Sequence, residues 1–278
     1  MALLRLQPSI GGAHHEIIKW HPRCLDCSGQ QGCAGLEHMP DIVDMHCHVL
    51  PGVDDGPATM ADAIAVLREA ERQGIGRMIV TPHYHPGRYV VPASKVMDVL
   101  DSVRETVRKE GIHIDLIPGQ ECYYFSDLVR ELDRGRVLTM AGTSYVLVEY
   151  DPPVLYSVIQ HSLRELIYSG YRPIIAHYER YQCLSGRMDR LEELRSNGAM
   201  LQLNFDRLLD RETLFRRNPW RRQFREGFVD FLGSDTHGMG FRPLHVDQAV
   251  DWIDSEVQPE IARMVMETNI DMLLEAEE

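Results

Sequence analysis

Short runs rich in β-branched and aromatic residues alternate along the chain with stretches of helical periodicity, starting at residue 41. The stretch 58–74 is typical of the helical kind, because its apolar residues recur at helical spacing and it ends on Gly74, a common helix stop. The pattern predicts strands at 41–45, 77–81, 112–117, 145–150, 172–176, 199–204 and 229–234. It predicts helices at 58–74, 93–110, 126–133, 154–169, 187–197, 212–227 and 244–254.

This alternation is typical of parallel strands that are joined by right-handed helical crossovers. The chain has 278 residues, an ordinary length for one α/β barrel, and it lacks the glycine-rich loops of nucleotide-binding open sheets. We therefore predict an α/β fold, a distorted seven-stranded (β/α) barrel of the TIM-like kind. The barrel domain is predicted at residues 41–278, and an N-terminal extension at 1–40 is expected to be flexible.

The charge balance and the cysteine usage restrict the partners and the compartment. The chain has 29 basic and 42 acidic residues, a formal net charge of −13. Such a surface repels nucleic acid and anionic lipid, so we predict no nucleic-acid partner. No stretch is long and apolar enough for direct membrane insertion, and the opening MALLRLQPSIGG is a poor signal peptide. The six cysteines follow no disulfide-rich pattern, which favours a cytoplasmic protein.

The N-terminal extension contains a possible zinc motif. Cys24, Cys27 and Cys33 lie beside His21 and His38, and a CxxC pair with a nearby cysteine and histidine can bind zinc. However, no second CxxC pair follows. The alternative is an extension that carries no chemistry, and the sequence leaves both interpretations open.

Polar side chains follow six of the seven predicted strands. In a parallel barrel, the loops after the carboxyl ends of the strands build the active site. Burying unpaired charge there would be costly, and divalent cations would remove that cost, so the pattern predicts a metal centre. The sixth strand contributes little beyond Asn204. The candidates in strand order are His46, His48, Asp54 and Asp55; His83 and His85; Glu121; Glu149; His177, Glu179 and Arg180; and Asp235 and His237.

The spacing of these candidates agrees with a metal centre. Strand side chains alternate, so His46 and His48 should point to one face while Cys47 points to the other. Pro82 and Pro86 bracket the next pair, His83 and His85, so the strand is expected to end before them and only one of the two need bind. Imidazole and carboxylate ligands without thiolate favour Mn²⁺, Fe²⁺ or Zn²⁺, and the number of candidates suits two or three ions.

Taken together, the motifs resemble those of the polymerase-and-histidinol-phosphatase (PHP) superfamily of metal-dependent phosphoesterases. The resemblance covers about residues 41–254 and is carried, in order, by DMHCHVLPGVDDGP, TPHYHPG, GQECYY, YVLVEY, AHYERY and GSDTHG. Within this superfamily, the LPGVDDGP, GQE and AHxERY segments are similar to the manganese-dependent protein-tyrosine phosphatases encoded in bacterial capsule and exopolysaccharide loci. The resemblance implies a distorted seven-stranded barrel with a trinuclear metal site.

The resemblance also assigns roles to individual residues. Glu121 matches a bridging carboxylate, and Arg180 matches a phosphate-binding arginine that would be catalytic. Tyr178 stands where most relatives have proline, which could alter the turn between His177 and Arg180. The implied metal ligands are His46, His48, Asp55, His83, Glu121, Glu149, His177, Asp235 and His237.

The implied function is a metal-dependent phosphatase that hydrolyses phosphotyrosine on proteins. Its cofactors would be two to three divalent ions, Mn²⁺ first, with Fe²⁺ or Zn²⁺ as alternatives. Its partner would be the tail of a bacterial tyrosine autokinase that regulates capsular or exopolysaccharide synthesis. His85 or Asp54 could supply a proton to the leaving group. The basic segment 215–227 is interpreted as a solvated helix face, or alternatively as a guide for an acidic peptide.

Two other interpretations are considered. A histidinol-phosphate phosphatase, or another small-molecule phosphoesterase on the same barrel, would require a closed pocket with an acidic partner for the substrate ammonium. A metal-binding regulatory protein without catalysis belongs to a different class. The presence of all the implied ligands together with Arg180 counts against this second alternative.

Overall fold

The computed structural model describes residues 42–210 and 217–275 of the chain. The predicted extension at 1–40 lies outside the described residues, and so do its cysteines Cys24, Cys27 and Cys33. The domain boundary at residue 41 therefore stays a prediction.

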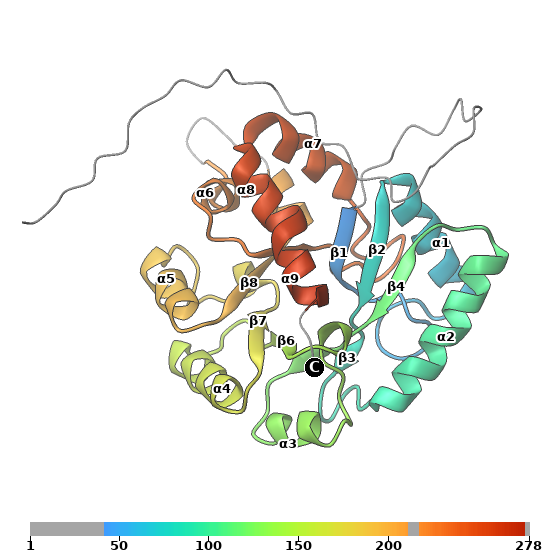
Figure 1. Cartoon of the computed structure of the whole chain (residues 1–278), viewed down its shortest axis with the longest axis horizontal. Helices are drawn as coiled ribbons and strands as arrows, with labels where there is room; N and C mark the ends of the chain where they lie inside the picture. Colours follow the sequence, from blue (N-terminus) through green and yellow to red (C-terminus); the bar gives the residue numbers. More distant parts are fainter. Residues whose placement is uncertain (1–41, 211–216, 276–278) are drawn as a thin grey trace, which may run out of the picture. The chain divides into compact units, whose positions relative to one another are not determined.

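Parallel strands form the centre of the described part (Figure 1). They lie in two sheets, in the orders β1-β2-β4 and β3-β5-β6-β7-β8-β9. Two residues separate β2 from β3 and two separate β4 from β5, so the labelled strands correspond to the seven predicted ones with two of them interrupted. The strands are β1 (Ile42–Cys47), β2 (Ile75–Val80), β3 (His83–Tyr84), β4 (Asp115–Pro118), β5 (Glu121–Tyr123), β6 (Tyr145–Glu149), β7 (Arg172–Ile175), β8 (Met200–Asn204) and β9 (Phe231–Gly233).

The curled sheet closes where β9 meets β1. The Asp235 amide donates to the His46 carbonyl over 2.7 Å, and the His48 amide donates to the Thr236 carbonyl over 2.9 Å. Cys47 and Thr236 form a parallel bridge between these hydrogen bonds. The prediction of a distorted, seven-stranded α/β barrel is therefore confirmed.

Helices surround the strands (Figure 1). An outer apolar layer joins them to the sheet, and it includes Cys47 and Cys122 from the strands. The helices are α1 (Met60–Arg72), α2 (Ala93–Lys109), α3 (Leu128–Asp133), α4 (Tyr156–Tyr168), α5 (Met188–Ser196), α6 (Pro219–Arg225), α7 (Val246–Glu256), α8 (Pro259–Arg263) and α9 (Asn269–Glu275). Short helical turns are η1 (Met140–Gly142), η2 (Tyr178–Arg180), η3 (Phe205–Leu209) and η4 (Met264–Thr268).

Apolar side chains fill the barrel interior before the polar site begins. Met45 on β1 and Phe231 on β9 belong to this inner cluster, and α9 adds Ile270 and Leu273 to it. The pairing of β1 with β2 is irregular between Asp44 and Cys47. Such irregularities re-aim side chains next to active sites. Here the side chains that point into the barrel change from the apolar Met45 to the polar His46 that follows it.

Three local expectations were wrong. β4 begins at Asp115 rather than at residue 112. β3 forms at His83–Tyr84 although prolines flank this segment, because it pairs in parallel with β5. The helices α8 and α9 after residue 254 were not predicted. Their apolar pattern is short, and it is α9 that packs against the barrel interior.

The basic segment 215–227 includes α6, which Asn218 caps by accepting from the Trp220 and Arg221 amides. The Arg222 guanidinium pairs with Glu226, and that of Arg225 pairs with Glu256. These pairs fit the interpretation as a solvated helix face. The first residues of the predicted helix, 212–216, lie outside the described residues.

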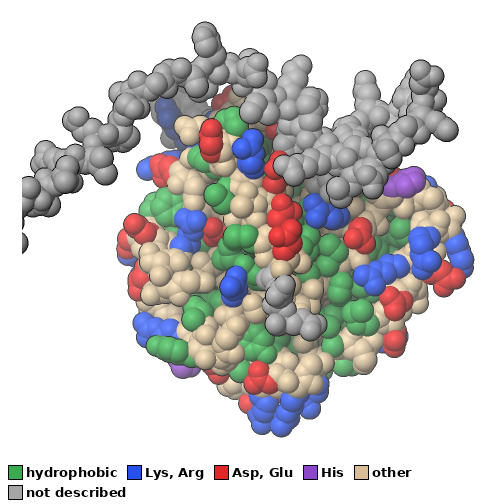
Figure 2. All heavy atoms as spheres, viewed as in Figure 1, with side chains coloured by type: hydrophobic (Ala, Val, Ile, Leu, Met, Phe, Trp, Pro, Cys, Tyr) green, Lys and Arg blue, Asp and Glu red, His purple; other side chains and the backbone are tan. Residues whose placement is uncertain are grey.

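Acidic, basic and apolar side chains are intermixed on the face seen in Figure 1, as Figure 2 shows. Across residues 42–210 and 217–275, none of the helices combines the length and the apolar character that a membrane crossing needs.

Candidate metal centre

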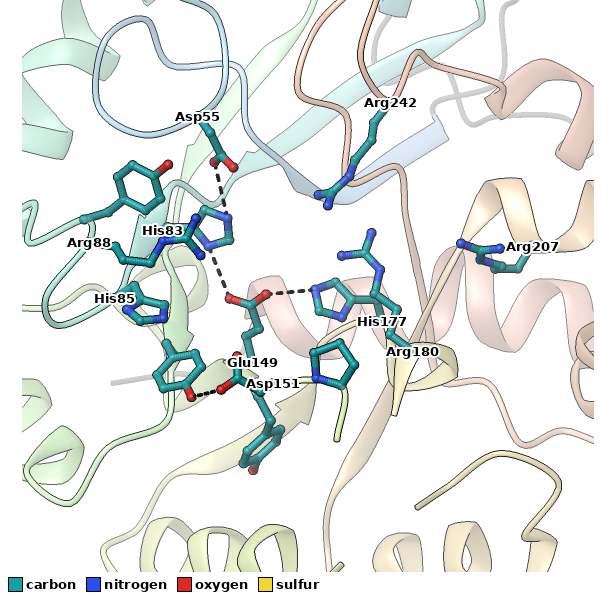
Figure 3. A pocket seen from close by; sticks show the side chains of 14 residues that line it. Asp55, His83, His85, Arg88, Glu149, Asp151, His177, Arg180, Arg207 and Arg242 are labelled. Carbon is teal, nitrogen blue, oxygen red and sulfur yellow. Dashed lines mark hydrogen bonds and ion pairs between the residues drawn. The ribbon is translucent and has the colours of Figure 1, made fainter. Parts of the chain in front are cut away.

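The nine predicted ligands gather at the carboxyl ends of the strands. His46, His83, Glu121 and Glu149 lie on β1, β3, β5 and β6, and the others lie in the loops that directly follow strands. Figure 3 shows Asp55, His83, Glu149 and His177 around one cavity. The ring of candidates is thus assembled from strands far apart in the sequence, as the barrel requires.

The two histidines of the HxH motif point to the same face. His46 Nε2 and His48 Nε2 lie 3.2 Å apart, and they are 3.3 and 3.2 Å from Glu121 Oε2. Cys47 points away into the outer apolar layer, and its Sγ donates to the Ile79 carbonyl over 3.4 Å. The alternation that the sequence predicted is therefore confirmed.

Glu121 is the central carboxylate of the cluster. Its Oε2 lies 3.0 Å from His83 Nδ1, and its Oε1 lies 2.8 Å from His177 Nε2. Burial opposes ionisation, but the imidazoles of His46, His83 and His177 hold the pKa of Glu121 well below its usual range. A charged carboxylate among several imidazoles is positioned as a bridging ligand would be.

The cluster contains three overlapping groups of potential ligand atoms, and within each group these atoms lie within 4.8 Å of one another. His48, His83 and Glu121 each belong to two groups, so neighbouring ions could share ligands. His177 joins the cluster through Glu121, and its Nε2 also lies 3.7 Å from Glu149 Oε1. The three groups are His48, Asp55, His83 and His237; His46, His48, Glu121 and Asp235; and His83, Glu121 and Glu149.

These residues fit divalent cations. His83 Nδ1 and Glu121 Oε2 are buried and have no hydrogen-bond partner, and leaving such atoms unsatisfied is costly. The donor set consists of imidazole nitrogens and carboxylate oxygens, which suits Mn²⁺, Fe²⁺ or Zn²⁺. The individual ligand roles of the nine residues stay predictions.

Asp54 has a supporting position rather than that of a proton donor. Its Oδ2 lies 2.7 Å from His48 Nδ1 and accepts from the His83 amide over 3.0 Å, while Oδ1 accepts from the Gly56 amide. Burial opposes its ionisation, but His48 lowers the pKa of Asp54. A charged Asp54 holds the His48 ring so that Nε2 faces the cluster, a usual arrangement behind a metal-binding histidine.

Gln202 on β8 is a site residue that was not predicted from the sequence. Its Oε1 lies 3.0 Å from His46 Nδ1 and accepts from the His177 amide over 2.7 Å. Its Nε2 donates to Asn204 Oδ1, and Asn204 in turn donates to Asp235. The signal was present in LQLN, because alternation places both amides on the same face of a buried strand.

Arg180 reaches the cluster from the turn η2. His177 precedes this turn with a left-handed φ of 31°. The Arg180 guanidinium, whose side chain is 21% exposed, donates to Asp235 Oδ2. Burial disfavours its charge, but the carboxylates around it, Asp235 first, raise the pKa of Arg180 further. Tyr178 fits this turn with its hydroxyl donating to Gln223 over 2.7 Å.

Glu179 does not pair with Arg180. Its Oε1 lies 3.7 Å from Arg207 Nε, and burial raises the pKa of Glu179 to about 7. Glu179 was among the candidates predicted from the sequence, but its carboxylate belongs to none of the three groups of ligand atoms found in the described part of the chain.

Arg242 is a second missed residue. Its Nη1 lies 3.1 Å from Asp235 Oδ2 and 3.3 Å from His237 Nε2. Together with Arg180 it places two guanidinium groups on one carboxylate. The signal was weak, since Arg242 lies five residues beyond His237 in a loop that strand periodicity does not reach.

The cluster forms part of a cavity of about 450 Å³, a usual size for a ligand site. Figure 3 shows His85 and Arg88 on one side of Glu149, and Arg180, Arg207 and Arg242 on the other. The side with Arg180, Arg207 and Arg242 would attract an anionic group that enters the cavity. The chain as a whole has a net charge of −13 and would repel an anionic group, so the local positive charge of these arginines would be needed to attract one.

A parallel barrel with imidazoles and carboxylates at the carboxyl ends of its strands defines a metal-dependent hydrolase of the PHP kind. The family described as "Capsular polysaccharide synthesis, CpsB/CapC" matches residues 42–275. The chain belongs to this family.

Similar proteins carry related names. The chain is 27% identical to the tyrosine-protein phosphatase CpsB of Streptococcus agalactiae over 84% of this chain and 98% of that protein. It is 30% identical to the tyrosine-protein phosphatase YwqE of Bacillus subtilis over 84% of this chain and 91% of YwqE.

The fold is also similar to solved structures. A crystal structure from the work on YwqE of Bacillus subtilis and CpsB of Streptococcus pneumoniae, described as "unique metal-dependent tyrosine phosphatases", matches with a TM-score of 0.77 and 29% identity. The match covers 85% of this chain and 96% of the chain in the crystal structure. The Escherichia coli phosphotriesterase homology protein, with a TM-score of 0.54 and 12% identity over 86% of this chain and all of that one, shares the fold.

Proposed function

We propose that this chain is a metal-dependent phosphatase that removes phosphate from tyrosine side chains of proteins. The observation that carries the proposal is the juxtaposition, in one cavity, of the Glu121-centred cluster with the guanidinium groups of Arg180 and Arg242. Membership of the CpsB/CapC family and the names of its relatives support the same activity.

Divalent ions, when bound, supply Lewis-acid charge stabilisation and lower the pKa of water toward neutrality. The residues that would hold them are the nine predicted ligands, with Glu121 shared between ions. We propose Mn²⁺ as the physiological ion, with Fe²⁺ and Zn²⁺ as alternatives that the same donor set would accept.

The chain's own residues would bind and orient the substrate. Arg180 and Arg242 approach from the same side and can each offer forked N–H donors to phosphoryl oxygens. Their positive charge would stabilise the transition state most, because negative charge develops on those oxygens there. Asp54 and Gln202 would keep His48 and His46 aligned during this step.

The leaving group also favours an aryl phosphate. A phenol has a pKa of about 10, far below that of an alkyl alcohol, so a departing phenolate needs less help from a proton donor. Asp54 is committed to His48 and to two amides. An aryl substrate is therefore the easier one for a site in which Asp54 serves the cluster and Asp151 accepts from the Tyr123 hydroxyl.

We propose that the partner is the phosphotyrosine-bearing tail of a bacterial tyrosine autokinase that regulates capsular or exopolysaccharide synthesis. The support is the resemblance of the motifs together with the family description. A cytoplasmic location is part of the proposal, and the free Cys47, Cys122 and Cys183 agree with a reducing compartment.

The experiment is the turnover of a phosphotyrosyl peptide and of histidinol phosphate, side by side, with added Mn²⁺. We expect kcat/KM to be far higher for the peptide. Preferential turnover of histidinol phosphate would instead favour a small-molecule phosphoesterase. Metal binding without turnover of either compound would favour a regulatory protein.

A further inference from the structure

We infer that His85 and Tyr123 form an aromatic wall that receives the phenyl ring of phosphotyrosine and favours aryl over alkyl phosphates. The inference rests on the proposed function and deepens it, since it assigns specificity to two side chains that are not among the predicted ligands. The observations that carry it are the strand register, the ring geometry and the position of the arginines.

These two side chains lie just beyond the metal cluster, Tyr123 at the end of β5 and His85 directly after β3. The strands pair in parallel, with His83 opposite Glu121 and Tyr84 opposite Cys122. Tyr84 and Cys122 point into the outer apolar layer. Because side chains alternate, Tyr123 at the end of β5 returns to the side of Glu121, roughly 7 Å further along the strand. His85 directly follows β3, and its ring stacks on that of Tyr123.

The two rings form one fixed surface. The His85 and Tyr123 rings stack with centroids 4.0 Å apart and an interplanar angle of 29°. The Tyr123 hydroxyl donates to Asp151 Oδ2 over 2.8 Å, and His85 Nδ1 lies 3.0 Å from the Pro86 carbonyl oxygen. Both side chains line the cavity. Held at their polar ends, they offer a preformed apolar face at little cost in side-chain entropy.

The guanidinium groups of Arg180 and Arg242 lie across the cavity from this wall, whereas that of Arg88 lies on the side of the wall. Figure 3 shows His85 on one side of Glu149 and Arg180 and Arg242 on the other. A phosphoryl group held between the cluster and these arginines would leave its ester substituent to extend toward the cavity mouth. In phosphotyrosine that substituent is a flat ring, which can pack against His85 and Tyr123. A short alkyl substituent would gain much less contact there.

Direct binding of two substrate mimics to the Mn²⁺-loaded protein tests the wall without requiring turnover. Benzylphosphonate carries a phenyl ring on the methylene group that replaces the ester oxygen, whereas ethylphosphonate carries a methyl group there. We expect wild-type protein to bind benzylphosphonate more tightly in isothermal calorimetry. His85→Ala and Tyr123→Ala should each reduce this preference roughly two- to tenfold, the range for an aromatic contact.

Conservative variants separate stacking from other roles. His85→Phe and Tyr123→Phe keep an aromatic face, so both variants should keep the preference for benzylphosphonate. If His85 acted here as a proton donor, or Tyr123 through its hydroxyl, the phenylalanine variants would lose this preference. Tyr171→Ala is the matched control, because the Tyr171 hydroxyl also donates to a carboxylate, that of Asp133, but its side chain does not line the cavity. It should leave both affinities unchanged.

The inference is overturned if the alanine variants keep the wild-type preference, or if they weaken both phosphonates equally. It is also overturned if the preference is absent from the wild-type protein. Failure of the proposed function would look different, because phosphotyrosyl peptide would not be hydrolysed while the binding preference persisted.

Discussion

His83 Nδ1 lies 3.0 Å from Glu121 Oε2, but the two atoms do not meet with hydrogen-bond geometry. Both are buried, and neither has another hydrogen-bond partner. Elsewhere in the cluster, His46 Nε2 and His48 Nε2 lie 3.3 and 3.2 Å from the same Glu121 oxygen. Desolvated groups of this kind are stabilised by a cation that neutralises the carboxylates and takes up the nitrogen lone pairs. The relationship between these two atoms is thus the physical reason for expecting a metal centre.

The first prediction concerns removal of the metal. Treatment with a chelator should abolish phosphotyrosyl-peptide hydrolysis and lower Tm, because ions that bind the folded state stabilise it by mass action. Adding Mn²⁺ or a similar ion should restore both properties. Activity and Tm should be measured on samples whose metal content is known from elemental analysis. Full activity in metal-free protein would rule out metal dependence.

The second prediction is that Glu121→Gln loses metal as well as rate. The neutral amide keeps the shape of the side chain but cannot balance the charge of two cations, and burial makes that loss severe. Metal content per chain and kcat should be measured together. Glu193→Gln is the control, since this glutamate accepts from Tyr156 and Gln160 on the surface. A Glu121→Gln protein with full metal content and normal turnover would contradict the bridging role.

Much of this architecture could be predicted because strand periodicity is visible in short segments of sequence. Parallel strands that alternate with helices can then be arranged in only a few ways, of which a barrel is one. The candidates at the strand ends were accessible for the same reason, since each lies on a strand or in the loop that directly follows one, and the resemblance selected the nine ligands among them. The motif HxH was especially informative, because His46 and His48 can share a face only on a strand.

The remaining features depend on tertiary contacts. Arg242 lies in an irregular loop, and only the folded chain brings it to Asp235. Gln202 looked like an ordinary strand residue because a neutral amide carries no charge signal. The strand β3 formed despite its flanking prolines, since pairing with β5 outweighed the local preference. Helix α9 depends on the barrel interior that it covers.

The third prediction separates phosphate binding from metal binding. Arg180→Ala should reduce kcat/KM by roughly 10²–10³, the usual loss for one preorganised charge-stabilising donor. Metal content should stay close to that of the wild type, because a guanidinium does not ligate cations. Arg180→Lys should recover part of the loss, since an ammonium keeps the charge without the fork. Wild-type kcat/KM in Arg180→Ala would remove Arg180 from the mechanism.

The fourth prediction concerns Arg242, which shares Asp235 with Arg180. Arg242→Ala should lower kcat/KM, and the double variant should lose less than the product of the two single losses, because residues that act on the same group are not additive. Arg222→Ala is the control, since this arginine pairs with Glu226 on α6. Strictly independent effects in the double-mutant cycle would show that the two arginines do not act on one phosphoryl group.

The fifth prediction tests the support behind the ligands. Gln202→Leu removes the oxygen that faces His46 Nδ1 and accepts from the His177 amide. The His46 ring should then lose its fixed orientation, and metal affinity should fall by roughly 10- to 100-fold, as for other residues that orient metal ligands. The buried His177 amide also loses its acceptor, which should cost about 1–3 kcal/mol of unfolding free energy.

A matched control separates these two effects of Gln202→Leu. Gln223 is also buried and accepts a hydrogen bond, from the Tyr178 hydroxyl, but it does not contact the cluster. Gln223→Leu should therefore lower stability without weakening metal binding. Metal affinity should be measured by competition with a chelator, at a temperature where both variants are folded by circular dichroism. Equal metal affinity in Gln202→Leu and in the wild type would show that His46 is oriented by the strand alone and does not need the amide.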